Sequence, residues 1–66
     1  MSYDEAIAEV RSGKYAWRQV WNDSAYLYLN GNEIFIMREG VGVPYTPTGQ
    51  DTSATDWDGG DKPPKR

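Results

Sequence analysis

The sequence predicts a small α+β protein in which an N-terminal helix packs on an antiparallel sheet. Two observations lead to this fold class. Residues 3–10 carry apolar side chains at helical spacing. Residues 14–37 alternate as strands do, with an Asn30-Gly31 pair between two apolar runs, a strong hairpin signal. We therefore expect a single domain over residues 1–57, with three antiparallel strands and the helix covering one face.

The helix has signals for both of its ends. Ser2 and Glu5 are spaced for a capping box, in which each side chain bonds the backbone N–H of the other residue. Gly13 is placed to end the helix in a left-handed conformation. The residues that fall on one face are Tyr3, Ala6, Ile7 and Val10. These agreeing signals predict a short amphipathic helix.

Three strands are expected in the middle of the chain. Residues 14–20 alternate in side-chain type, which predicts the first strand. Residues 21–24 are expected to form a turn, because Asn and Asp side chains bond their own backbone there. Residues 25–30 and 33–37 predict the second and third strands, joined through Asn30-Gly31.

The stretch from Arg38 to Gly49 is rich in glycine and proline, so we expect it to be mainly loop. Val41, Val43 and Tyr45 form an alternative, a short edge strand. A loop of this length in so small a domain is often functional.

The end of the chain predicts less regular structure. Asp51 is expected to cap one helical turn over residues 51–54, and residues 55–57 to form a short last strand. Residues 58–66 combine glycine, proline and charge without apolar residues, so we expect a disordered C-terminal tail.

The composition excludes several classes of function. The 66 residues include no cysteine and no histidine, which rules out disulfides and Ser/His/Asp or Cys/His catalysis. We expect no enzyme, no cofactor and no metal site. Residues 1–57 carry a net charge of −4, which argues against binding duplex nucleic acid. No apolar run approaches the roughly 20 residues of a membrane span and no signal peptide precedes the helix, so we expect no membrane contact and a cytoplasmic location.

Binding is the chemistry that the remaining residues favour. Arg18 lies on a predicted strand among aromatic residues, and an arginine held this way can grip a phosphate with two hydrogen bonds. Trp21, Tyr45 and Trp57 could stack on a base or line a pocket. Thr46 lies beside Tyr45 between two prolines, which would preorganise a pocket wall. These five residues are the predicted ligand-binding set.

Structural roles remain open for the same residues. The tryptophans could equally be core or subunit-interface residues, as large side chains are in small domains. Arg18 could form a structural ion pair with Asp51 or Asp56. We expect these two aspartates to cap and orient, and a glycosidase-type carboxylate pair is the weaker interpretation because both lie where caps and turns are needed.

Two blocks of residues resemble a known phage family. The first block consists of Tyr3, Ala6, Gly13-Lys14, Arg18 and Trp21. The second consists of Pro47, Asp51, Ala54, Asp56 and Trp57. In this order and spacing they resemble the second Thoeris anti-defence family, and together they bracket residues 3–57. The chain lacks the longer insertion that many members carry between the first hairpin and the Asp-Trp block.

The resemblance implies a function that spacing alone does not show. Members are small α+β proteins that assemble as homo-oligomers, typically tetramers. They sequester glycocyclic ADP-ribose, the Thoeris immune signal, in pockets between protomers without breaking a bond. Some relatives also hold cyclic oligonucleotides of the CBASS system, and one relative was first described as an anti-CRISPR protein.

We therefore expect a phage protein that binds and sequesters a cyclic nucleotide signal in the host cytoplasm, as a dimer or tetramer. The rival from another class is an acidic protein–protein inhibitor of a host defence enzyme, acting as a nucleic-acid mimic. The two differ in behaviour, because a sponge is stabilised by its ligand whereas a mimic binds a basic protein instead.

Overall fold

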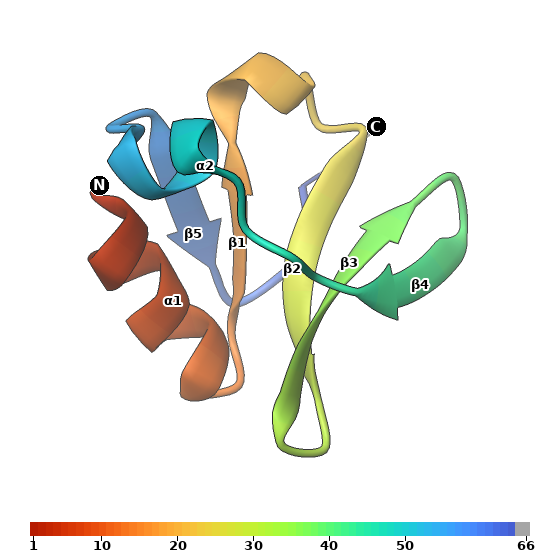
Figure 1. Cartoon of the computed structure of the whole chain (residues 1–66). Helices are drawn as coiled ribbons and strands as arrows, with labels where there is room; N and C mark the ends of the chain where they lie inside the picture. Colours follow the sequence, from red (N-terminus) through yellow and green to blue (C-terminus); the bar gives the residue numbers. More distant parts are fainter. Residues whose placement is uncertain (65–66) are drawn as a thin grey trace.

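The computed structural model describes residues 1–64 and shows an α+β fold. A five-stranded antiparallel sheet has the strand order β4-β3-β2-β1-β5, and both α-helices lie on the same side of it (Figure 1). In chain order the elements are α1 (Tyr3–Arg11), β1 (Tyr15–Arg18), the 3-10 helix η1 (Gln19–Trp21), β2 (Ala25–Asn30), β3 (Glu33–Arg38), β4 (Val41–Pro44), α2 (Gly49–Ser53) and β5 (Trp57–Gly60). The predicted fold class and the helix that covers one face are confirmed.

Helix α1 follows its sequence signals closely. The capping box forms, with the Ser2 backbone N–H donating to the Glu5 carboxylate at 2.9 Å and the Glu5 N–H donating to the Ser2 hydroxyl. Gly13 has a φ of +97°, the left-handed conformation that ends a helix at little cost for glycine. Ala6 and Val10 are fully buried. The helix therefore packs through the face that the spacing predicts.

Two hairpins build the middle of the sheet. Asn30 pairs with Glu33, so Gly31 and Asn32 form the two-residue loop, one position later than the predicted Asn30-Gly31 turn. Gly31 takes the positive φ of +65° that the loop requires. The next loop is Glu39-Gly40, where both residues have positive φ, and it returns the chain as β4. The edge-strand alternative for this region is thus confirmed, and the expectation of a loop over residues 38–49 is wrong for its first part.

The ends of the predicted strands differ from the structure in three places. Strand β1 stops at Arg18, because the chain turns into η1 instead of continuing to Val20. The sheet has five strands, because the three expected central strands are joined at the edges by β4, the alternative edge strand, and by β5, which spans Trp57–Gly60 and not the expected residues 55–57. Strand β5 reaches Gly60 and pairs with β1, so a disordered tail beginning at Asp58 is wrong for residues 58–60. Residues 65 and 66 of that tail lie outside the described residues.

The two faces of the sheet differ in character. The face under the helices holds the core, whose buried members are Ala6, Val10, Ala16, Ala25, Leu27, Ile36 and Trp57. The opposite face is rich in half-buried aromatic side chains, with Tyr15 against Tyr26 and Tyr28 against Phe35. Cross-strand pairing explains this division, because Leu27 pairs with Ile36 while the adjacent pair, Tyr28 with Phe35, points to the other face of the sheet.

Candidate functional site

Asp51 is the centre of a polar network that joins three parts of the fold. The residue as a whole is only 8% exposed. One carboxylate oxygen accepts a hydrogen bond from Arg18 Nη1 at 3.1 Å, and the other accepts from the Tyr45 hydroxyl at 2.8 Å. Burying a carboxylate is costly unless it is paired and hydrogen-bonded, and both conditions are met here. The network fixes Tyr45 and α2 against β1.

The network forms because α2 presents Asp51 inward. Thr48 is the N-cap residue of this helix, and its hydroxyl accepts from the Asp51 backbone N–H at 3.2 Å. The prediction that Asp51 caps this turn is therefore wrong. With Thr48 as the cap, the Asp51 side chain is free to meet Arg18 and Tyr45, a pairing that local sequence could not show.

Asp56 is the second acceptor for Arg18 and also orients η1. Its carboxylate accepts from Arg18 Nε at 2.9 Å and from the Val20 backbone N–H at 3.3 Å. Its carbonyl accepts from the Gln19 N–H at 3.0 Å. These bonds satisfy N–H groups at the start of η1, which have no partner within the helix itself.

The pKa shifts agree with this charge distribution. The hydrogen bond to Arg18 is the main cause that lowers the pKa of Asp56, and the bond to Asp56 is the main cause that raises the pKa of Arg18. Burial and then the bond to Asp51 raise the pKa of Tyr45. At neutral pH Arg18 is therefore a guanidinium, Tyr45 a protonated phenol that donates, and Asp56 a carboxylate that accepts.

In this structure Arg18 forms ion pairs with Asp51 and Asp56. Its side chain is 14% exposed, and both Nε and Nη1 are bonded to carboxylates, Asp56 and Asp51 respectively. A bidentate phosphate grip uses Nη2 together with Nε or Nη1, and both Nε and Nη1 already donate to a carboxylate. A phosphate at Arg18 would therefore compete with Asp51 or Asp56, and the phosphate role of Arg18 stays a prediction.

Trp57 belongs to the core. It is 1% exposed, and its Nε1 donates to the Asp51 carbonyl at 3.0 Å. Its ring meets Tyr3 and Trp21 edge to face, with centroid distances of 5.8 and 5.3 Å. The enclosed indole has no free face in this arrangement, and its predicted contact with ligand stays a prediction. Trp21 is half-buried on the outer side of this stack.

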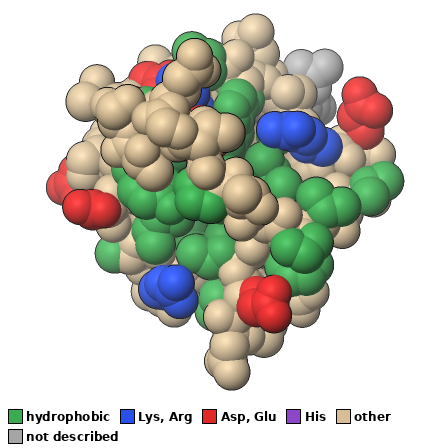
Figure 2. Space-filling model, in the orientation of Figure 1, with side chains coloured by type: hydrophobic (Ala, Val, Ile, Leu, Met, Phe, Trp, Pro, Cys, Tyr) green, Lys and Arg blue, Asp and Glu red, His purple; other side chains and the backbone are tan. Residues whose placement is uncertain are grey.

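Tyr45 forms part of a groove on the helix side of the sheet. The groove has a volume of about 360 Å³ and lies between α1 and the strands β3 and β4. It is lined by Tyr3, Ile7, Arg11, Asn32, Glu33, Ile34, Pro44, Tyr45 and Pro47. Figure 2 shows hydrophobic side chains gathered on this face between α1 and the β3–β4 hairpin. The groove joins segments that are distant in sequence.

Of the predicted binding residues, only Tyr45 lines this groove. Thr46 is exposed next to it and is not among the lining residues. Arg11 also lines the groove and was not among the predicted binding residues, since its place in the last turn of α1 is explained locally by a favourable interaction with the helix dipole. No local pattern brings Arg11 to Tyr45, so only the packing of α1 against the sheet could reveal it.

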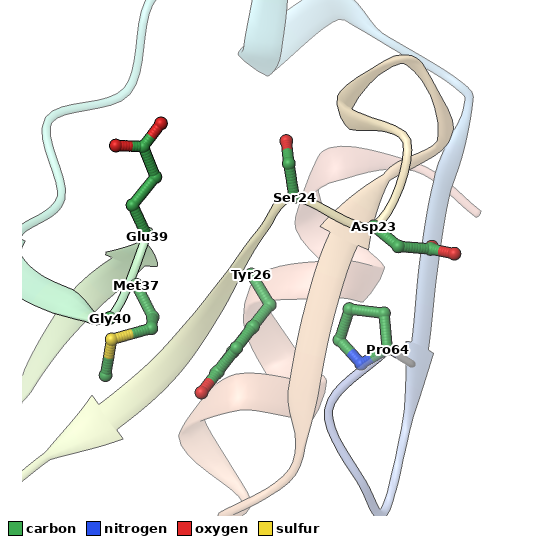
Figure 3. A pocket seen from close by; sticks show the side chains of 7 residues that line it. All are labelled: Asp23, Ser24, Tyr26, Met37, Glu39, Gly40 and Pro64. Carbon is green, nitrogen blue, oxygen red and sulfur yellow. The ribbon is translucent and has the colours of Figure 1, made fainter. Parts of the chain in front are cut away.

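A second hollow lies beside the start of β2 and the end of β3 and has a volume of about 560 Å³ (Figure 3). Its lining includes Tyr26 and Met37, with Pro64 on one side. The two charged residues that line it, Asp23 and Glu39, are both acidic. An anionic ligand would be repelled there, so the groove beside Tyr45 is the better candidate for such a ligand.

Residues 1–64 contain no group of three or more acidic side chains that could hold a metal ion. No helix in this part of the chain is long and apolar enough to cross a membrane.

Comparison with known proteins places the chain in a family. No curated protein matches it as an individual relative. The model of the Tad2-like family, described as a Thoeris anti-defense 2-like domain, matches residues 1–58. This match covers all of α1 and the sheet as far as the start of β5, including the network around Asp51. The chain therefore belongs to the Tad2-like family of Thoeris anti-defence domains.

Proposed function

We propose that this anti-defence protein acts inside the infected host cell by binding and sequestering an anionic cyclic nucleotide signal without cleaving it. Glycocyclic ADP-ribose of the Thoeris system is the first candidate ligand, and CBASS cyclic oligonucleotides are the second. The observation that supports the proposal is the groove beside Tyr45, in a chain that belongs to an anti-defence family. Its volume of about 360 Å³ falls in the usual range for small-molecule sites, about 300–1,000 Å³.

The groove is suited to sequestration because one of its walls is fixed before ligand arrives. The Tyr45 hydroxyl is held by Asp51, and the Tyr45 N–H donates to the Ile34 carbonyl at 3.0 Å. Pro44 and Pro47 limit the backbone on either side of Tyr45. A ligand that enters a preformed site loses less binding energy to ordering of the protein.

Homo-oligomerisation is part of the proposal. One groove accommodates about one nucleotide unit, so a cyclic dinucleotide-sized signal would extend beyond a single protomer. The aromatic face opposite the helices offers a large surface through which copies could associate. Sedimentation velocity tests this point, and a monomer at all concentrations, with and without ligand, would contradict it.

The test of sequestration is a capture-and-release experiment. Purified protein is incubated with glycocyclic ADP-ribose isomers and a panel of cyclic di- and trinucleotides. The protein is removed by filtration, the free ligand is measured, and the protein fraction is heated and analysed by mass spectrometry. We expect one ligand to be depleted and then recovered intact, and a small acidic protein of another fold serves as control.

Two other outcomes would redirect the proposal. A ligand recovered with a changed mass would indicate hydrolysis and not sequestration. Ligands that all remain free would favour the acidic protein–protein inhibitor, which predicts binding to a basic host protein.

A further inference from the structure

Arg11 differs from the other positive side chains around α1 and β1 in having no carboxylate partner. Lys14 lies 3.9 Å from Glu9 and 3.8 Å from Asp61, and Arg18 is bonded to two aspartates. Within residues 1–64, Arg11 forms no ion pair, although it lines the groove. Its guanidinium is thus available to a ligand and lies where a ligand would bind.

The rest of the groove determines which ligand fits beside Arg11. Tyr3 and Ile7 of α1 face Ile34 of β3, and Pro44, Tyr45 and Pro47 complete the lining. Aromatic and apolar walls of this kind accept a flat ring, since every base has a π-face that stacks on tyrosine or packs on proline. A guanidinium beside such walls suits a phosphate attached to that ring.

We propose that Arg11 is the anion-binding residue of this groove, and that the groove accepts the base and phosphate of one nucleotide unit of the sequestered signal. The inference rests on the proposed function and names the residue that recognises the ligand. In this proposal the phosphate is bound by Arg11, which lines the groove, and not by Arg18, which forms ion pairs with two aspartates.

Glu33 makes the two sides of the groove differ in charge, with the negative side on β3 and the positive side on α1. It lies on β3 next to Asn32 of the β2–β3 loop, and both line the groove. A carboxylate repels phosphate, so the phosphate belongs on the α1 side with Arg11. Donor groups of the ligand, such as a ribose hydroxyl or a base amino group, belong on the β3 side, where the Glu33 carboxylate and the Asn32 carbonyl can accept.

The first arm of the test uses AMP and adenosine as probes on the full chain, because they differ only by the phosphate. Binding is followed by amide chemical shifts in NMR titrations. We expect shifts at Arg11, Ile34 and Tyr45, and at least a tenfold preference for AMP over adenosine. Equal affinities for the two probes, or shifts confined to other parts of the fold, would overturn the inference.

The second arm uses matched charge variants. Arg11→Gln should lower affinity for AMP by about 10- to 100-fold, as expected on losing a charge-assisted hydrogen bond, and leave adenosine unchanged. Arg11→Lys keeps the charge but not the two-pronged geometry and should be intermediate. Arg38→Gln removes the same charge from the end of β3, outside the groove lining, and should stay within about threefold of wild type. Arg11 and Arg38 variants of equal effect would show a general charge effect and refute the site.

The third arm separates this inference from the proposed function. Wild type and Arg11→Gln are compared in the capture-and-release experiment, with circular dichroism to show that both are folded. Capture by wild type and not by Arg11→Gln supports both proposals. Equal capture by the two proteins overturns the role of Arg11 and leaves sequestration standing. A wild type that captures no signal overturns the proposed function itself.

Discussion

Removing one oxygen atom from Tyr45 tests the network that holds the groove wall. The Tyr45→Phe variant keeps the ring and deletes the hydroxyl that donates to Asp51 at 2.8 Å. A hydrogen bond to a charged group contributes about 1.5–3 kcal/mol. We expect the lower half of that range, because Asp51 keeps its bond from Arg18. A chain of 66 residues has a total stability of about 3–10 kcal/mol, so the loss is readily measured.

Urea unfolding at fixed protein concentration, followed by tryptophan fluorescence, measures this effect. With a slope of about 1 kcal/mol/M, the midpoint should fall by about 1.5–2 M while the slope stays constant. Tyr26→Phe is the matched control, since Tyr26 lies on the opposite face and its hydroxyl forms no hydrogen bond within residues 1–64. A Tyr45→Phe midpoint equal to that of Tyr26→Phe would refute the reasoning.

The pH dependence gives a second readout of the same bond. The pKa of Tyr45 is raised above its ordinary value of 10.0, so the folded state favours the protonated phenol. The stability from this bond is fully present below pH 10 and is lost as pH rises through the folded pKa. The gap in unfolding free energy between wild type and Tyr45→Phe should therefore stay constant up to about pH 10 and narrow as pH rises above that value. A gap that stays constant above pH 10 would exclude this explanation.

Three further variants test other parts of the fold. Arg18 lowers the pKa of Asp56 below its ordinary value of 3.8, so the stability it contributes is present above about pH 4 and is lost as pH falls through the folded pKa. Wild type and Asp56→Asn should therefore converge in urea midpoints between pH 4 and 2, and parallel curves would be evidence against the ion pair. Trp57→Ala should cost about 3–5 kcal/mol, comparable with the whole stability, and leave a largely unfolded chain by circular dichroism; a cooperative melt near that of wild type would show that the indole is dispensable. Gly49→Ala should raise the unfolding free energy by about 0.4–1 kcal/mol, because Gly49 has no positive φ and an added methyl group meets no described atom within 4 Å. A lower thermal midpoint for this variant would contradict that expectation.

The sequence by itself determined the elements whose causes are local. The capping box of Ser2 and Glu5, the apolar spacing of α1 and the stop at Gly13 act within a few residues of one another, and all three form. The hairpin between β2 and β3 is likewise coded by a turn between two apolar runs. Such short-range signals need no knowledge of the rest of the fold, which is why the fold class followed from them.

Short elements at the edges were harder to predict because their stability comes from pairing. Strand β5 contains Gly59 and Gly60, which disfavour a strand, and it forms because residues 57–60 pair with β1. The chain that joins β1 to β5 is about 40 residues long, so no local sequence pattern predicts this pairing. For this reason the predicted domain ended at residue 57, and residues 58–60 were expected to be disordered.

Tertiary structure alone decided the roles of the candidate site residues. Both bonds between Arg18 and its aspartates span more than 30 residues, and they make Arg18 part of the network that holds α2 and η1 against β1. Thr48 took the cap that Asp51 was expected to form, which released the Asp51 carboxylate for Arg18 and Tyr45. The groove exists only because α1 packs across the sheet and leaves Arg11 beside Tyr45. Residue types set which chemistry was possible, and long-range packing decided which side chains are bonded to the framework and which remain free for a ligand.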